Sequence, residues 1–83
     1  MKITIKYFAS IRESLGQGSE QRDTAATTLG ELRDELLAAG PAYAAALARG
    51  KAVRLALDQV MQTESALLTD GCEVAFFPPV TGG

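Results

Sequence analysis

Two short strand-like stretches near the ends of this chain, the first alternating and the second almost wholly apolar, limit its fold more than any other feature. The two stretches are residues 2–8, near the start, and residues 73–77, near the end. Because successive side chains of a strand point to opposite faces, each stretch is predicted to form a strand with one apolar face. The residues on those apolar faces are Ile3, Ile5, Tyr7, Val74 and Phe76.

The clearest helix is predicted between these two strands, over residues 28–39. Thr28 can cap its first turn, and Glu31, three residues later, completes a capping-box pattern that satisfies otherwise unpaired amides. We interpret the acidic residues Glu31, Asp34 and Glu35 as a solvated outer face. Helical spacing places on the inner stripe Leu29, Leu32, Leu36 and Ala39.

Shorter elements are predicted around that helix in the first half of the chain. Residues 9–15 can form a short helix that ends at Gly16. Residues 19–24 are polar, so a strand there would be an exposed one. Pro41 suits the first turn of an alanine-rich helix that runs to about Ala48, because an amide is not needed at that position.

The second half of the chain predicts short strands joined by turns. Residues 52–57 alternate, and residues 60–61 can return beside them after a turn at residues 58–59. Asp70 and Gly71 signal another turn before the last strand. The residues expected to face the core in this region are Val53, Leu55 and Leu57.

Strands at both ends that flank one substantial helix favour an α+β fold. The economical arrangement is a mixed sheet with that helix packed across one face. The 83 residues leave room for one domain, and a hydrophobic content of 47% suffices for a modest core without disulfides or metal. We therefore expect one domain over residues 1–77, followed by an extended tail over residues 78–83.

Composition excludes several classes of function. Eight Lys and Arg stand against 10 Asp and Glu without a basic cluster, which argues against binding to nucleic acid. The chain has no histidine and one cysteine, so zinc sites, Ser-His-Asp triads and an internal disulfide are excluded, and no metal site is expected. No stretch approaches the roughly 18 apolar residues that span a bilayer. We expect a soluble cytoplasmic protein without membrane contact.

Two further motifs have simpler explanations than a functional site. Gly16-Gln17-Gly18 resembles part of a phosphate-binding loop, but a polar segment follows it and not a helix, so a turn is predicted. Cys72 follows the turn at residues 70–71 and has no histidine to activate it. We interpret Cys72 as a small residue at the start of a strand.

The last residues of the chain are the strongest candidate for a functional site. Pro78 and Pro79 favour extended geometry, and residues 78–83 at full extension would reach on the order of 20 Å. Gly82 and Gly83 have no side chains and could enter a narrow channel. A carrier that delivers its end into another protein's active site needs these properties, although a frayed terminus is also consistent with the pattern.

The α-carboxylate of Gly83 is the one unusual functional group of this tail. A carboxylate is a poor electrophile, so it would need activation, for which adenylation by ATP is the general biochemical route. The chain shows no nucleotide site, so a partner enzyme would carry out that step. We expect Phe76 in the core and Phe77 on the outer face, where Phe77 could anchor a partner near the root of the tail.

These residues resemble a known family. The ending Phe76-Phe77-Pro78-Pro79-Val80-Thr81-Gly82-Gly83, with Asp70-Gly71 and Glu73-Val74-Ala75 before it, is similar to that of the small subunits of molybdopterin synthase. The start of the chain, Ile5-Lys6-Tyr7-Phe8-Ala9 with Ile11-Arg12-Glu13, is similar to the same family. The middle of the chain matches by pattern alone.

The resemblance implies a ubiquitin-like β-grasp fold and a role in sulfur transfer. An adenylyltransferase similar to ubiquitin-activating enzymes would adenylate Gly83 with ATP, and a sulfur-donor protein would supply sulfur for a thiocarboxylate. The tail would insert into the large synthase subunit, within a heterotetramer, and donate sulfur to the dithiolene of molybdopterin, made from cyclic pyranopterin monophosphate. The chain itself would bind no cofactor. The residues implied in binding the large subunit are Phe77, Pro78, Pro79, Val80, Thr81 and Gly82.

Three alternatives stay open beside this reading. Sulfur carriers for thiamine or cysteine synthesis also end in Gly-Gly, although the Phe-Phe-Pro-Pro stem favours the molybdopterin branch. A ubiquitin-like protein modifier would form amide bonds to lysines, and a plain interaction domain would have an inert tail. The chain departs from the family at Asp58, where asparagine is common, and at Cys72, where an acidic residue is common, but both positions concern turns.

Overall fold

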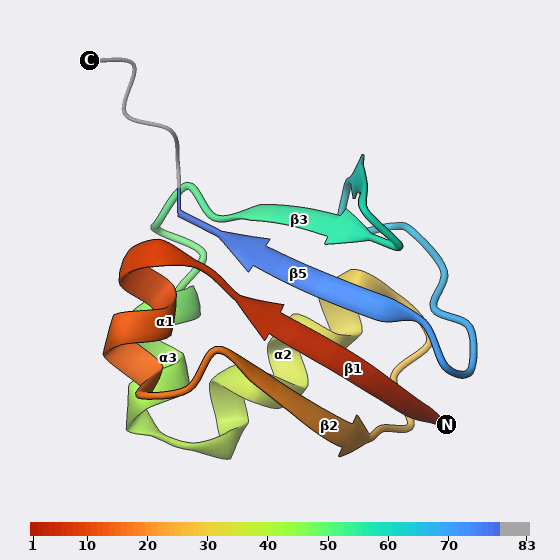
Figure 1. Ribbon diagram of the computed structural model, residues 1–83, viewed down its shortest axis with the longest axis horizontal. Helices are drawn as coiled ribbons and strands as arrows, with labels where there is room; N and C mark the ends of the chain where they lie inside the picture. Colours follow the sequence, from red (N-terminus) through yellow and green to blue (C-terminus); the bar gives the residue numbers. More distant parts are fainter. Residues whose placement is uncertain (79–83) are drawn as a thin grey trace.

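The computed structural model describes residues 1–78 and arranges them as a mixed sheet packed against helices (Figure 1). Each expected helix and strand is confirmed, with ends that differ by at most two residues. Along the chain, the elements are β1 (Lys2–Tyr7), α1 (Ala9–Leu15), β2 (Ser19–Asp23), α2 (Leu29–Ala39), α3 (Pro41–Leu47), β3 (Arg54–Leu57), β4 (Val60–Gln62) and β5 (Glu73–Phe77).

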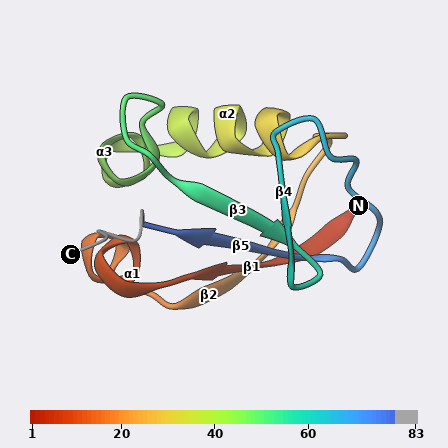
Figure 2. The ribbon, with the colours of Figure 1, turned by 90° about the horizontal axis from the view of Figure 1, so that it is seen from above.

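The sheet brings the two ends of the described chain together at its centre. Its strand order is β2-β1-β5-β3-β4, in which β1 and β5 are parallel and the other pairs are antiparallel. The register of the central pair aligns Ile5 with Val74 and Tyr7 with Phe76. Helix α2 lies across one face of the sheet, and the opposite face carries no helix at its centre (Figure 2). The predicted α+β arrangement is therefore confirmed.

The hydrophobic core lies between α2 and the covered face of the sheet. Leu29, Leu32 and Leu36 of the predicted helical stripe are fully buried there. Ala39 is exposed, and its assignment to the stripe was wrong, because the chain turns into α3 at Gly40 and leaves the end of α2 at the surface. The strands contribute to the core Ile3, Ile5, Tyr7, Leu55, Val74 and Phe76.

The start of α2 has the predicted cap with one difference. The Thr28 hydroxyl accepts a hydrogen bond from the amide of Glu31 at 3.1 Å, as expected. The Glu31 carboxylate does not accept a hydrogen bond from the Thr28 amide, as a capping box requires. Thr28 is extended and forms an isolated β-bridge with Leu67. It accepts instead from the amide and hydroxyl of Thr27, at 2.7 and 2.8 Å, and these bonds lower the pKa of Glu31.

The predicted outer face of α2 is not merely solvated. Glu35 accepts from Arg22 Nε and from the Thr24 hydroxyl, both at 2.6 Å, so it joins the helix to the end of β2. Asp34 forms an ion pair with Arg49. The prediction of a solvated face is confirmed for Glu31 and Asp34, which are exposed, but it was incomplete for Glu35, which is partly buried against partners from a distant segment.

Arg33 forms a buried polar clamp at the end of α3. The residue is 4% exposed, and its guanidinium donates to the carbonyls of Leu47 at 2.8 Å and Ala48 at 2.9 Å. The Arg33 guanidinium also forms an ion pair with Glu64, at 3.0 Å from Nη1. Glu64 accepts a second time, from Arg49. Carbonyls at a helix end have no partner within the helix, so Arg33 supplies the hydrogen bonds that α3 itself lacks.

We predict that Arg33→Met lowers the free energy of unfolding by about 2–3 kcal/mol, because buried carbonyls would lose their donors. Urea unfolding followed by circular dichroism measures this change. Arg12→Met is the matched control, since Arg12 is exposed and forms no ion pair with the described residues. Equal midpoints for the two variants would contradict the role of Arg33.

A second polar cluster joins the sheet to α3 around the carboxylate of Glu20. Tyr7 donates to this carboxylate at 2.8 Å and the Gln17 amide donates at 3.0 Å, while Tyr43 of α3 donates to the same oxygen. Desolvation raises the pKa of Tyr7 well above its usual range, and the bond to Glu20 raises it further. Tyr7 is therefore neutral in the folded protein at ordinary pH.

We predict that the protein loses stability above about pH 10, where tyrosines ionise in the unfolded chain while Tyr7 stays protonated in the fold. The stabilisation from protonated Tyr7 is fully present below about pH 10, because the pKa of Tyr7 is higher in the folded protein than in the unfolded chain. Tyr7→Phe should cost about 1–2 kcal/mol at pH 8 and flatten the loss above pH 10. Urea midpoints from about pH 8 to 11 test this, and parallel pH curves for both proteins would refute it.

Candidate functional site

The predicted tail leaves the domain at the end of the central strand β5. Phe77 is the last residue of β5 and pairs with Arg54 of β3. Pro78 follows as the last described residue and is partly buried at the root of the tail. The other predicted tail residues lie outside the described residues, so their roles stay predictions. They are Pro79, Val80, Thr81, Gly82 and Gly83.

The two phenylalanines before the tail point to opposite faces of the sheet, as predicted. Phe76 is fully buried in the core and stacks on Tyr7, with ring centroids 6.0 Å apart. Phe77 is half-buried on the face without α2 and stacks on Phe8, with centroids 4.7 Å apart and an interplanar angle of 7°. This confirms Phe77 as an outward residue beside the tail.

Phe8 is a member of this site that sequence reasoning did not select. Its ring is 40% exposed, and its amide donates to the Phe76 carbonyl at 3.2 Å, which continues the pairing of β1 with β5. The next residue, Ala9, has φ of 49°, an uncommon conformation that starts α1 immediately after the strand. The sequence did contain a signal for this role, because Phe8 is an aromatic residue on the strand face that otherwise carries Lys2, Thr4 and Lys6.

The paired rings belong to a larger apolar surface, here called the docking face. It is formed by Phe8, Ala56, Met61, Ala75 and Phe77, and it surrounds a hollow of about 260 Å³. Met61 is 53% exposed, so much of this apolar surface is open to solvent. Lys6 and Glu73 form an ion pair of 3.4 Å beside it. Exposed apolar surface of this kind, next to the tail, is typical of a site for binding another protein.

The weaker sequence candidates take structural roles. Cys72 is buried in the core, and Gly16 ends α1 in the left-handed conformation, with φ of 73°. The neighbouring Gln17 side chain donates to Glu20 and Tyr43, so the segment is a turn tied to the sheet, as expected.

The described residues were also compared with what a metal site and a membrane-spanning helix require. Within residues 1–78, no group of carboxylate, cysteine or histidine side chains is placed to hold a metal ion. No helix of that part is long and apolar enough to cross a membrane.

Comparison with curated proteins finds relatives along nearly the whole chain. The sulfur carrier subunit of molybdopterin synthase from Escherichia coli is 40% identical over 81 residues, which cover 98% of this chain and 99% of that protein. The subunit of the same name from Haemophilus influenzae is 35% identical over the same shares of the two chains.

Solved structures share the fold. SAMP1 from Haloferax volcanii superimposes with a TM-score of 0.80 and 25% identity, with both chains fully covered. A subunit in the complex of subunits 1 and 2 of the molybdopterin-converting factor from Helicobacter pylori superimposes with a TM-score of 0.71 and 24% identity, also over both full chains.

The element order, the sheet and these superpositions agree with the ubiquitin-like β-grasp fold that the resemblance implied. The family comparison points the same way, because the ThiS family matches residues 5–83, from the first strand through the Gly-Gly end. The chain belongs to the ThiS family, and its curated relatives are sulfur carrier subunits of molybdopterin synthase.

Proposed function

We propose that this protein is the sulfur carrier subunit of a molybdopterin synthase. The observation that carries the proposal is the 40% identity to a protein of that name, which extends over almost the full length of both chains. The stem Phe-Phe-Pro-Pro and the Gly-Gly end belong to the part of the chain that the family matches.

The docking face supports this proposal physically. A carrier must present its terminus to another protein, and a stable orientation requires contacts close to the root of the tail. Phe8 and Phe77 provide a rigid aromatic pair at that root, and Met61 adds an adaptable apolar side chain. We infer that the large synthase subunit covers this face while it receives the tail.

The chemistry that we propose takes place at Gly83. A partner adenylyltransferase transfers AMP from ATP to the Gly83 carboxylate and releases pyrophosphate, which makes the carbonyl carbon a good electrophile. A hydrosulfide ion released by a donor protein then attacks that carbon, displaces AMP as the leaving group and gives a thiocarboxylate. The large subunit uses that sulfur for the dithiolene of molybdopterin, and the carrier returns with a carboxylate.

The assembly and location are parts of the same proposal. Two carriers would bind a central dimer of large subunits as a heterotetramer, and the carrier itself would bind no cofactor. ATP would be consumed by the activating partner. We place the reaction in the cytoplasm, where that nucleotide is available.

A protein modifier is the second candidate function. It is supported by superposition on Haloferax volcanii structures, one of them named SAMP1 and another named small archaeal modifier protein 1. Modifier and carrier would share the activation of Gly83 and differ in the product, which is an amide to lysine in one case and a thiocarboxylate in the other.

We predict that the intact protein gains the mass of one oxygen-to-sulfur exchange when it is incubated with its activating enzyme, ATP and a sulfur donor. Mass spectrometry of the whole chain measures this shift. Deletion of Gly83 should abolish it, because the shortened chain ends on a different carboxylate. An unchanged mass under conditions that modify a known carrier would refute the proposal, and lysine conjugates would favour the modifier.

We predict that Phe8→Ala and Phe77→Ala each weaken binding to the large subunit by about 30-fold, as expected for loss of a central aromatic anchor. Isothermal titration calorimetry measures the dissociation constants. Leu67→Ala is the matched control, because Leu67 is 69% exposed and does not belong to the docking face. Equal affinity of all three variants would rule out the docking face as the binding surface.

A further inference from the structure

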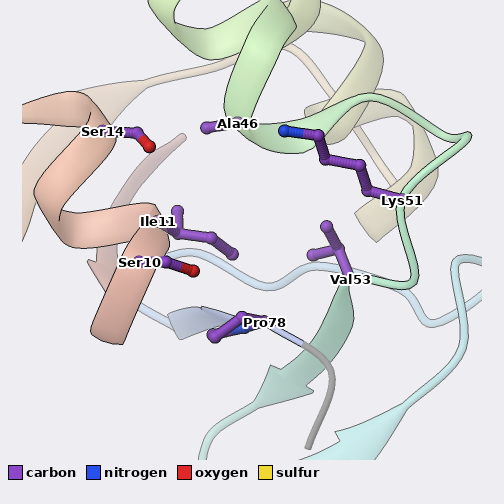
Figure 3. Close-up of a pocket in the computed structure, with 7 residues that line it drawn as sticks. All are labelled: Ser10, Ile11, Ser14, Ala46, Lys51, Val53 and Pro78. Atoms are coloured by element: carbon purple, nitrogen blue, oxygen red, sulfur yellow. The ribbon is translucent and has the colours of Figure 1, made fainter. Parts of the chain in front are cut away.

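A second pocket lies at the root of the tail and is separate from the docking face. It has a volume of about 150 Å³ and opens between α1, the end of α3 and the loop of residues 48–53 (Figure 3). Ile11, Val53 and Pro78 contribute its apolar wall. Ser10, Ser14 and Lys51 contribute polar groups, and Figure 3 shows the Lys51 ammonium at one edge of the lining residues, pointing toward Ala46.

The charge of Lys51 is available for an external partner. Lys51 is exposed and forms no ion pair with any residue from 1 to 78, whereas Arg22, Arg33 and Arg49 are each paired with carboxylates. Arg54 is also exposed and without an ion pair in that part of the chain, and it pairs with Phe77 at the root of the tail. The surface around the root therefore carries positive charge that no carboxylate among residues 1–78 pairs with.

The size and chemistry of the pocket select a single acidic side chain as its occupant. Pockets for cofactors and drug-sized ligands usually measure about 300–1,000 Å³, so this pocket is too small for a nucleotide. The apolar wall suits the methylene groups of glutamate or aspartate. The Lys51 ammonium and the two serine hydroxyls are suitable donors to the carboxylate.

The position of the pocket identifies the protein that would supply this side chain. Pro78 is both part of the pocket wall and the first residue of the tail, so a protein that encloses the tail down to its root would lie beside this pocket. We propose that the pocket binds a glutamate or aspartate of the large synthase subunit, at the rim of the channel that takes the tail. This inference rests on the proposed function and adds a specificity contact to it.

The test compares Lys51→Glu and Lys51→Gln with a control, Lys2→Glu, because Lys2 is exposed at the far end of β1. Calorimetric titration with the large subunit should show about 10-fold weaker binding for Lys51→Glu and a smaller loss for Lys51→Gln, because charge reversal adds repulsion. Lys2→Glu should bind within about twofold of the unchanged protein. Added salt should weaken the unchanged protein more than Lys51→Gln.

Separate readouts distinguish this inference from the proposed function. All three variants should still gain sulfur mass with the activating enzyme, and the urea midpoints of the two Lys51 variants should match that of the unchanged protein. Equal binding of Lys51→Glu and the unchanged protein overturns the pocket alone. A loss of the mass shift without a loss of binding assigns the pocket to the activating enzyme and also overturns the proposal. Failure of the unchanged protein to bind the large subunit overturns the proposed function itself.

Discussion

Parallel pairing of β1 with β5 at the centre of the sheet is the interaction on which the rest of the structure depends. The register aligns Tyr7 with Phe76 in the core, so the residues that follow them, Phe8 and Phe77, emerge together on the opposite face. A slip of one residue would exchange the two faces of a strand. The same pairing therefore sets both the hydrophobic core and the aromatic pair beside the tail.

Polar contacts around α3 position the segments that form the pocket beside Pro78. Arg33 binds the carbonyls of Leu47 and Ala48, where the loop that carries Lys51 begins, and Tyr43 joins the middle of α3 to Glu20 on β2. These groups are buried or partly buried, so their hydrogen bonds position segments that have few large apolar side chains. The segment that carries Lys51 near Pro78 is therefore attached to the rest of the fold by buried and partly buried hydrogen bonds.

Local patterns were sufficient to predict most of the elements and their arrangement. Period-two alternation located the first strand, the turn at Asp70 and Gly71 marked the start of the last one, and Thr28 and Pro41 marked the starts of two helices. These signals depend on nearby residues. Groups that act over long sequence distances were missed. Arg33 and Glu35 find their partners in other elements, and the stacking of Phe8 on Phe77 joins residues near opposite ends of the chain.

The amino-acid sequence by itself determined the Gly-Gly end, the proline stem and the outward direction of Phe77, because chain chemistry and strand alternation are local properties. The tertiary structure alone decided that Phe8, Met61 and Phe77 form one apolar surface, and that Lys51 and Pro78 line one pocket. These groupings arise from the order and register of the strands. Pairing between distant segments sets that order, and no short stretch of residues encodes it.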